Sequence, residues 1–136
     1  MAASPPDPVR AFGGRVILDA GRAGPASHDR TGLRHVFVPS PEAAGWRYAL
    51  DVERKDTPLD PGLSAVLSAL DPSADPLLTW TRIEVAAKLL DRPAHLLLRR
   101  AQAQGLPGLA AAAGIEVADP PHPHHWISVA RIPDPA

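Results

Sequence analysis

Residues 81–107, TRIEVAAKLLDRPAHLLLRRAQAQGLP, decide the expected fold of this chain. The TRIE at 81–84 has the spacing of a capping box, in which a hydroxyl and a carboxylate satisfy the first amides of a helix. Apolar residues then recur at helical spacing as far as Leu90, and DRP at 91–93 indicates a tight turn. A second helix follows and ends at Gly105, since glycine is the preferred residue after a helix. The sequence therefore predicts two short amphipathic helices joined by a turn.

The second of these helices carries two adjacent arginines, Arg99 and Arg100, beside other polar side chains. Arginine can bond guanine with two hydrogen bonds, and glutamine can bond adenine. In the alternative interpretation the two arginines are only the solvated end of a core helix, where the helix dipole favours cations. The candidates for contact with nucleic acid or another partner are Arg82, Arg92, His95, Arg99, Arg100 and Gln102.

Residues 84–107 resemble the helix-turn-helix of bacterial DNA-binding regulators. In that pattern a small residue of the first helix, here Ala86 or Ala87, allows the two helices to cross closely. An apolar residue early in the second helix, here Leu96 or Leu97, anchors it. The resemblance implies a winged-helix-like domain that offers its second helix to DNA.

Three β-rich runs precede the helices, at 14–19, 35–38 and 46–52. The run at 46–52 alternates, with large apolar residues on one face and Arg47, Ala49 and Asp51 on the other. Short loops separate the last two runs, so we expect the three strands to form an antiparallel meander.

Helical and strand signals also flank the central stretch. Asp60 is placed to cap a helix over 61–70, because proline follows it at the first helical position. An Ala-rich turn of helix is expected at 109–113, and the runs at 115–117 and 126–132 predict two strands. If those strands pair, they form a hairpin directly after the helices, in the position of a wing.

These elements together predict an α+β fold, winged-helix-like, with a small antiparallel sheet and three to four helices. Residues 1–12 hold prolines and little apolar pattern, so they are expected to form a flexible N-terminal arm. A single domain is predicted over 13–132, with 133–136 as a tail.

The same order of strands and helices also resembles peptide-recognition domains of the PqqD type. That resemblance implies a protein that binds a leader peptide, or a subunit of a larger assembly, by adding the partner as a strand at a sheet edge. A net charge of −1 suits this mode better than it suits a strong non-specific DNA binder.

Composition narrows the classes of function. The chain has 136 residues, 45% of them apolar, which suits one soluble domain with a real core. It has no cysteine, no signal-peptide pattern and no apolar run near the ~20 residues that span a bilayer, so we expect a cytoplasmic protein without a membrane partner. No GxSxG, Walker or GxGxxG motif occurs, which favours a non-enzymatic binding module without a cofactor. A homodimer stays open.

A histidine-rich loop supplies a third hypothesis. His122, His124 and His125 form the one local cluster of candidate metal ligands, since imidazole binds zinc, nickel and copper. Under this hypothesis the protein is a small metal-dependent enzyme. The alternative is a loop of mildly polar residues that leads into a strand at Trp126.

Overall fold

The computed structural model describes residues 9–18, 26–28, 34–40 and 45–134, and the fold is α+β with four helices in those ranges. The strands are β1 Val9–Ala11, β2 Gly14–Ile17, β3 Ala26–His28, β4 Arg34–Val38, β5 Trp46–Arg54, β6 Glu116–Ala118 and β7 His125–Pro133. The helices are α1 Pro61–Leu70, α2 Pro76–Leu90, α3 Ala94–Gln104 and α4 Leu106–Ala113.

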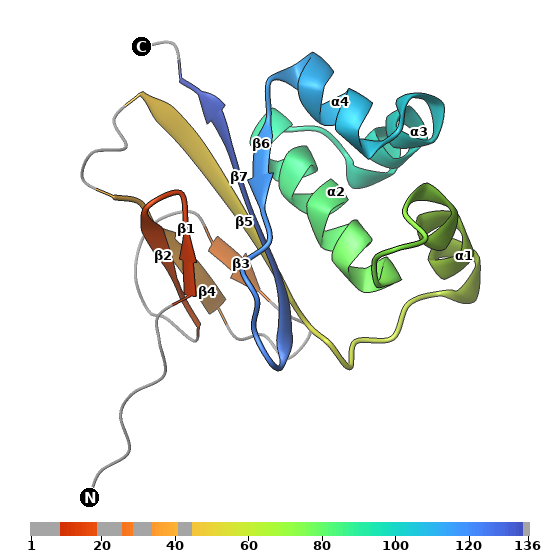
Figure 1. The fold of residues 1–136 in the computed structure, drawn as a ribbon, viewed down its shortest axis with the longest axis horizontal. Helices are drawn as coiled ribbons and strands as arrows, with labels where there is room; N and C mark the ends of the chain where they lie inside the picture. Colours follow the sequence, from red (N-terminus) through yellow and green to blue (C-terminus); the bar gives the residue numbers. More distant parts are fainter. Residues whose placement is uncertain (1–8, 19–25, 29–33, 41–44, 135–136) are drawn as a thin grey trace, which may run out of the picture.

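The described strands form two antiparallel sheets, with the orders β1-β2-β4-β3 and β5-β7-β6. The first sheet lies on one side of β5 and β7, and the helices lie on the other (Figure 1). The predicted alternation of β5 is confirmed. Leu50 and Val52 join the core shared with the first sheet, whereas Ala49 packs with Val85 of α2. Both faces of β5 are therefore covered.

The predicted meander of three strands is wrong. β2 and β4 pair with each other, but β5 belongs to the second sheet, where its partner is the distant β7. β1 lies inside the segment predicted as a flexible arm, where Val9 pairs with Val16, so the domain begins before residue 13. Residues 1–8 of that arm lie outside the described residues. The predicted tail is also shortened, because Pro133 pairs with Trp46 at the end of β7.

Helix α1 has its predicted bounds, and the Asp60 carboxylate accepts a hydrogen bond from the Leu63 amide at 3.1 Å. The predicted start of the next helix at Thr81 is wrong, because α2 begins at Pro76 behind an Asp75 cap. Asp75 accepts from the Leu77 amide at 2.9 Å, which is the same aspartate-proline signal that starts α1. Thr81 lies inside the helix and is fully buried.

The predicted corner between α2 and α3 is confirmed. Asp91 adopts the left-handed conformation with φ 52°, and the Arg92 amide donates to the Ala87 carbonyl at 3.0 Å. Leu97 anchors α3 and is fully buried. Gly105 ends α3 as predicted, with φ 78°, but α4 begins directly after it and takes Pro107 into its first turn.

Strands β6 and β7 pair as predicted, yet the hairpin does not act as a wing beside α3. β6 leads away from the end of α4, so the connection at 119–124 lies at the opposite end of the sheet from α3 and α4 (Figure 1). β7 is the middle strand of its sheet, and its residues from Ile127 to Ala130 are buried. The hairpin is therefore part of the core.

Candidate functional site

The predicted partner-binding residues, apart from Arg82, lie together on the outside of the α2–α3 corner and α3. Residues Arg92, His95, Arg99, Arg100 and Gln102 are all exposed, and they are called the α3 surface below. A helix turns about 100° per residue, so His95, Arg99 and Gln102 form one stripe along α3. Leu97 and Ala101 occupy the opposite side and are buried.

The α3 surface carries three positive charges, and the acidic residue nearest to it in sequence is Asp91, which is exposed at the corner. Residues 92–115 contain three arginines and no aspartate or glutamate. Within the described part of the chain, no ion pair involves any of these arginines. Described ion pairs elsewhere join Arg54 to Asp56, Arg82 to Asp71 and Asp119, Lys88 to Asp51, and Arg131 to Glu116. A chain of net charge −1 thus carries one local surface with a net charge of about +2 when Asp91 is included.

Arg47 of β5 lies beside the end of α2, and it is not among the predicted contact residues. Its Nη2 donates a hydrogen bond to the Leu89 carbonyl at 2.7 Å. That carbonyl belongs to the last turn of α2, where a cation also interacts favourably with the helix dipole. The alternation of β5 was the available signal, because it places Arg47 on the face that α2 covers.

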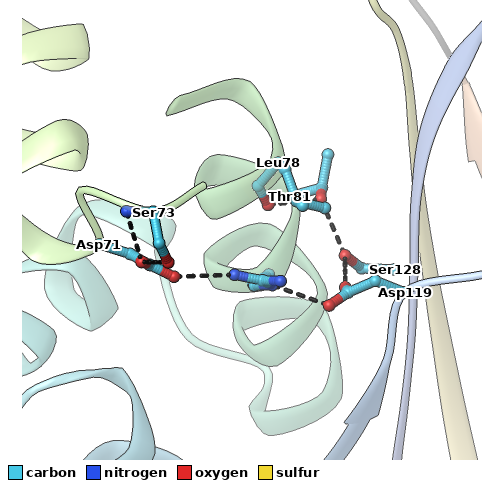
Figure 2. A network of polar contacts seen from close by, with 7 residues as sticks. Asp71, Ser73, Leu78, Thr81, Asp119 and Ser128 are labelled. Carbon is cyan, nitrogen blue, oxygen red and sulfur yellow. Dashed lines mark hydrogen bonds and ion pairs between the residues drawn. The ribbon is translucent and has the colours of Figure 1, made fainter. Parts of the chain in front are cut away.

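Arg82 does not belong to the α3 surface, so it is separated from the other predicted contact residues. Its Nε donates to Asp119 Oδ2 at 2.8 Å and its Nη1 to Asp71 Oδ2 at 3.2 Å (Figure 2). The side chain is 27% exposed. Arg82 lies in the first half of α2, about ten residues and 15 Å of helix from the corner. Two carboxylates therefore hold this guanidinium away from the other candidates.

A polar network continues from Asp119 into the sheet (Figure 2). Ser128 Oγ donates to Asp119 Oδ1 at 2.8 Å and lies 2.8 Å from Thr81 Oγ1. Thr81 Oγ1 also donates to the Leu78 carbonyl at 2.7 Å. The Ser128 hydroxyl proton goes to Asp119. The single Thr81 hydroxyl proton is therefore shared between Ser128 Oγ and the Leu78 carbonyl. The network fixes α2 against β7.

Beside Arg82 lies a pocket of about 270 Å³ between α2, α4 and β6. Its wall is mainly aliphatic, and Asp71, Arg82 and Asp119 form its polar end. The pocket shares no residue with the α3 surface. It is called the α2–α4 pocket below.

A second polar group lies where β5 faces α2. Lys88 Nζ donates to Asp51 Oδ1 at 3.0 Å and to the Leu50 carbonyl at 2.9 Å. Asp51 is 4% exposed, and burial raises the pKa of its carboxyl although Lys88 acts to lower it. Burial, together with the charge of Asp51, also raises the pKa of Glu84. We interpret this group as a structural ion pair.

The histidine loop brings two of its three predicted ligands together. Nδ1 of His122 lies 3.3 Å from Nδ1 of His125, but it also accepts a hydrogen bond from the His124 amide at 3.0 Å. The His124 side chain is exposed, and its ring centroid is 6.0 Å from that of His122. Burial, with His124 as the next cause, lowers the pKa of His122.

His35, a buried residue of β4, is not among the predicted ligands, and its ring centroid is 5.5 Å from that of His125. Among the residues that the structure describes, no group of three or more His, Asp or Glu side chains is arranged to hold a metal ion. The proposed metal-dependent enzyme at His122, His124 and His125 therefore has no geometric support.

The chain matches no protein-family model, no curated protein and no solved structure. In the described ranges the longest helix is α2, with 15 residues, and no helix there combines the length and apolarity needed to cross a membrane. The function is therefore inferred from the residues of the chain itself.

Proposed function

We propose that this protein is a non-enzymatic DNA-binding module that contacts duplex DNA through the α3 surface. The observation that carries the proposal is the set of three exposed arginines at and after the α2–α3 corner, without ion-pair partners in the described part of the chain. Phosphate contacts supply most of the affinity in protein–DNA binding, and arginine is well suited to them.

The stripe formed by His95, Arg99 and Gln102 gives α3 side chains that could reach base edges. In this proposal Arg92 at the corner and Arg100 on the flank contact phosphates beside the helix. Behind this stripe Leu97 and Ala101 hold α3 on the rest of the domain. This division of roles supports α3 as the recognition helix of a helix-turn-helix, although the β6–β7 hairpin does not lie beside it as a wing. The cytoplasmic location expected from the sequence stays part of the proposal.

Peptide recognition by strand addition is the alternative, and the sheet edges favour it less. β6 offers an edge of only three residues. At the other edge of that sheet, the Val52 amide of β5 already donates to Ser27 Oγ at 3.1 Å. An added strand would therefore find few open backbone groups at either place.

The test is fluorescence anisotropy with a labelled duplex of about 25 base pairs, titrated at several salt concentrations. Binding should weaken with salt, and the double variant Arg99→Ala, Arg100→Ala should bind at least tenfold more weakly. It should also reduce the slope of log affinity against log salt by about 0.9, because Arg100 is the one phosphate contact that it removes.

The matched control is the double variant Arg10→Ala, Arg15→Ala. These two arginines are exposed, lie opposite each other on β1 and β2, and change the net charge by the same amount. They are expected to leave DNA affinity within about twofold, because they lie on the first sheet. Absence of binding at low salt, or equal loss in both double variants, contradicts the proposal.

A further inference from the structure

The α2–α4 pocket has the size and lining of a site for a small molecule. Its aliphatic wall comes from three elements and comprises Ile83, Ala86, Leu106, Leu109, Ala110, Ile115 and Val117, with Pro107 at one side. Its volume is about 270 Å³. An apolar cavity of about 150 Å³ binds benzene, so this pocket has room for roughly a dozen non-hydrogen atoms.

The polar end of the pocket is a guanidinium held in a fixed orientation. Asp119 and Asp71 accept from Nε and Nη1 of Arg82, and their remaining oxygens accept from other donors. Ser128 donates to Asp119 Oδ1 at 2.8 Å, and the amide and hydroxyl of Ser73 donate to Asp71 Oδ1 at 3.1 and 2.6 Å. Every carboxylate oxygen therefore already has a protein donor.

The open hydrogen-bonding capacity at this end is that of a donor. Nη2 of Arg82 has no acceptor in the part of the chain that the structure describes, and Arg82 lines the pocket. A ligand at this end must therefore offer an acceptor oxygen.

The net charge of Arg82, Asp71 and Asp119 decides which kind of acceptor a ligand can present here. Two carboxylates and one guanidinium leave one net negative charge, which disfavours a carboxylate or phosphate on the ligand. A protonated amine has only donors and repels the guanidinium, so it cannot meet Nη2 of Arg82. We propose that the α2–α4 pocket binds a small uncharged apolar molecule that presents a carbonyl oxygen, such as a ketone, ester or amide, to Arg82.

This ligand site does not depend on DNA binding. None of its lining residues belongs to the α3 surface, so each proposal can fail while the other stands. A small molecule suits the site better than a peptide strand, since the volume holds about a dozen atoms and the edge of β6 is three residues long.

The test is a titration of the full chain with four probes of nearly equal size, in which amide chemical shifts report binding. The probes are acetophenone, benzoate, benzylamine and ethylbenzene. Acetophenone is expected to shift the amides of the α2–α4 pocket with a dissociation constant of the order of 1 mM, typical for a ligand of so few atoms. Benzoate and benzylamine should bind at least tenfold more weakly. Ethylbenzene should bind more weakly than acetophenone, because it lacks the acceptor.

A second experiment uses a variant in which a larger side chain fills the α2–α4 pocket. Ala110→Leu, which adds bulk to the lining of the pocket, should abolish the acetophenone shifts. Ala111→Leu adds the same atoms on the exposed side of α4 and should leave them unchanged. Equal binding of all four probes, tighter binding of benzoate, or no difference between the two variants overturns the proposal. So does the absence of any shift with acetophenone while the protein remains folded.

Discussion

Replacing Lys88 with methionine should destabilise the folded protein by about 2–3 kcal/mol at neutral pH. Methionine keeps the aliphatic stem that packs along α2 and removes only the ammonium group. The ammonium bridges β5 and α2 through Asp51 Oδ1 at 3.0 Å and the Leu50 carbonyl at 2.9 Å. Its loss leaves a carboxylate that is 4% exposed without its cation.

The magnitude follows from the exposure of the two partners. Removing one partner of a fully buried ion pair costs about 3–5 kcal/mol. The Lys88 side chain is 37% exposed, so water screens part of this interaction and the expected loss lies below that range. For a chain of 136 residues, about 2–3 kcal/mol corresponds to a fall in Tm of roughly 6–12 °C.

The pH dependence of this destabilisation tests whether the unpaired Asp51 carboxylate is its cause. Burial raises the pKa of Asp51 above its ordinary value of 3.8, so the folded protein holds this proton more tightly than the unfolded chain does. Ionised Asp51 therefore costs stability above its folded pKa, and that cost disappears as the pH falls through the folded pKa. Lys88 acts to lower the pKa of both Asp51 and Glu84, so Lys88→Met should raise both pKa values further. The difference from wild type should thus shrink between about pH 7 and pH 4.5.

The measurement is urea unfolding followed by tryptophan fluorescence, for wild type and variant at both pH values. Adding Asp51→Asn to Lys88→Met removes the unpaired charge and should recover at least about 1 kcal/mol at neutral pH. A loss below about 1 kcal/mol that does not change with pH would refute the reasoning, since it would mean that water reaches the carboxylate.

Two further predictions concern packing at the sheets. Thr81→Val keeps the shape of a fully buried side chain but removes the hydroxyl that contacts Ser128, so the free energy of unfolding in urea should fall by about 1–2 kcal/mol. The control Thr81→Ser keeps the hydroxyl and should retain most of this polar contact. Gly14→Ala would place a Cβ 2.6 Å from the Phe37 ring and should lower stability by about 2 kcal/mol in a thermal scan, whereas an unchanged Tm would show that β2 and β4 can separate without cost.

Signals within a few residues of each other predicted much of the helical region correctly. Asp60 with Pro61 sets the start of α1, and the corner at Asp91 follows from residues that are neighbours in sequence. The exposure of Arg99 and Arg100 also follows locally, because the helical period places Leu97 and Ala101 on the buried side. The same aspartate-proline signal at Asp75 starts α2, whereas the capping-box pattern at Thr81 predicts a start five residues too late.

Two of the three-residue strands, β1 and β3, were not predicted from such local signals. β1 and β3 have three residues each, too few for an alternating pattern to stand out. They exist as strands because β2 and β4 pair with them. The division of the strands into two sheets depends likewise on β7, whose pairing with β5 joins residues as far apart as Trp46 and Pro133.

The amino-acid order by itself determined the aspartate-proline caps that begin α1 and α2, which side of α3 is buried and where three arginines gather in a stretch, 92–115, that contains no acidic residue. Only the tertiary structure decided that Arg82 is held in place, since its partners Asp71 and Asp119 are 11 and 37 residues away. It also decided that Thr81 bonds Ser128, 47 residues distant, and that a pocket opens between α2, α4 and β6. Caps and helical periods act over a few residues, whereas charge pairing and cavity shape arise when distant segments meet.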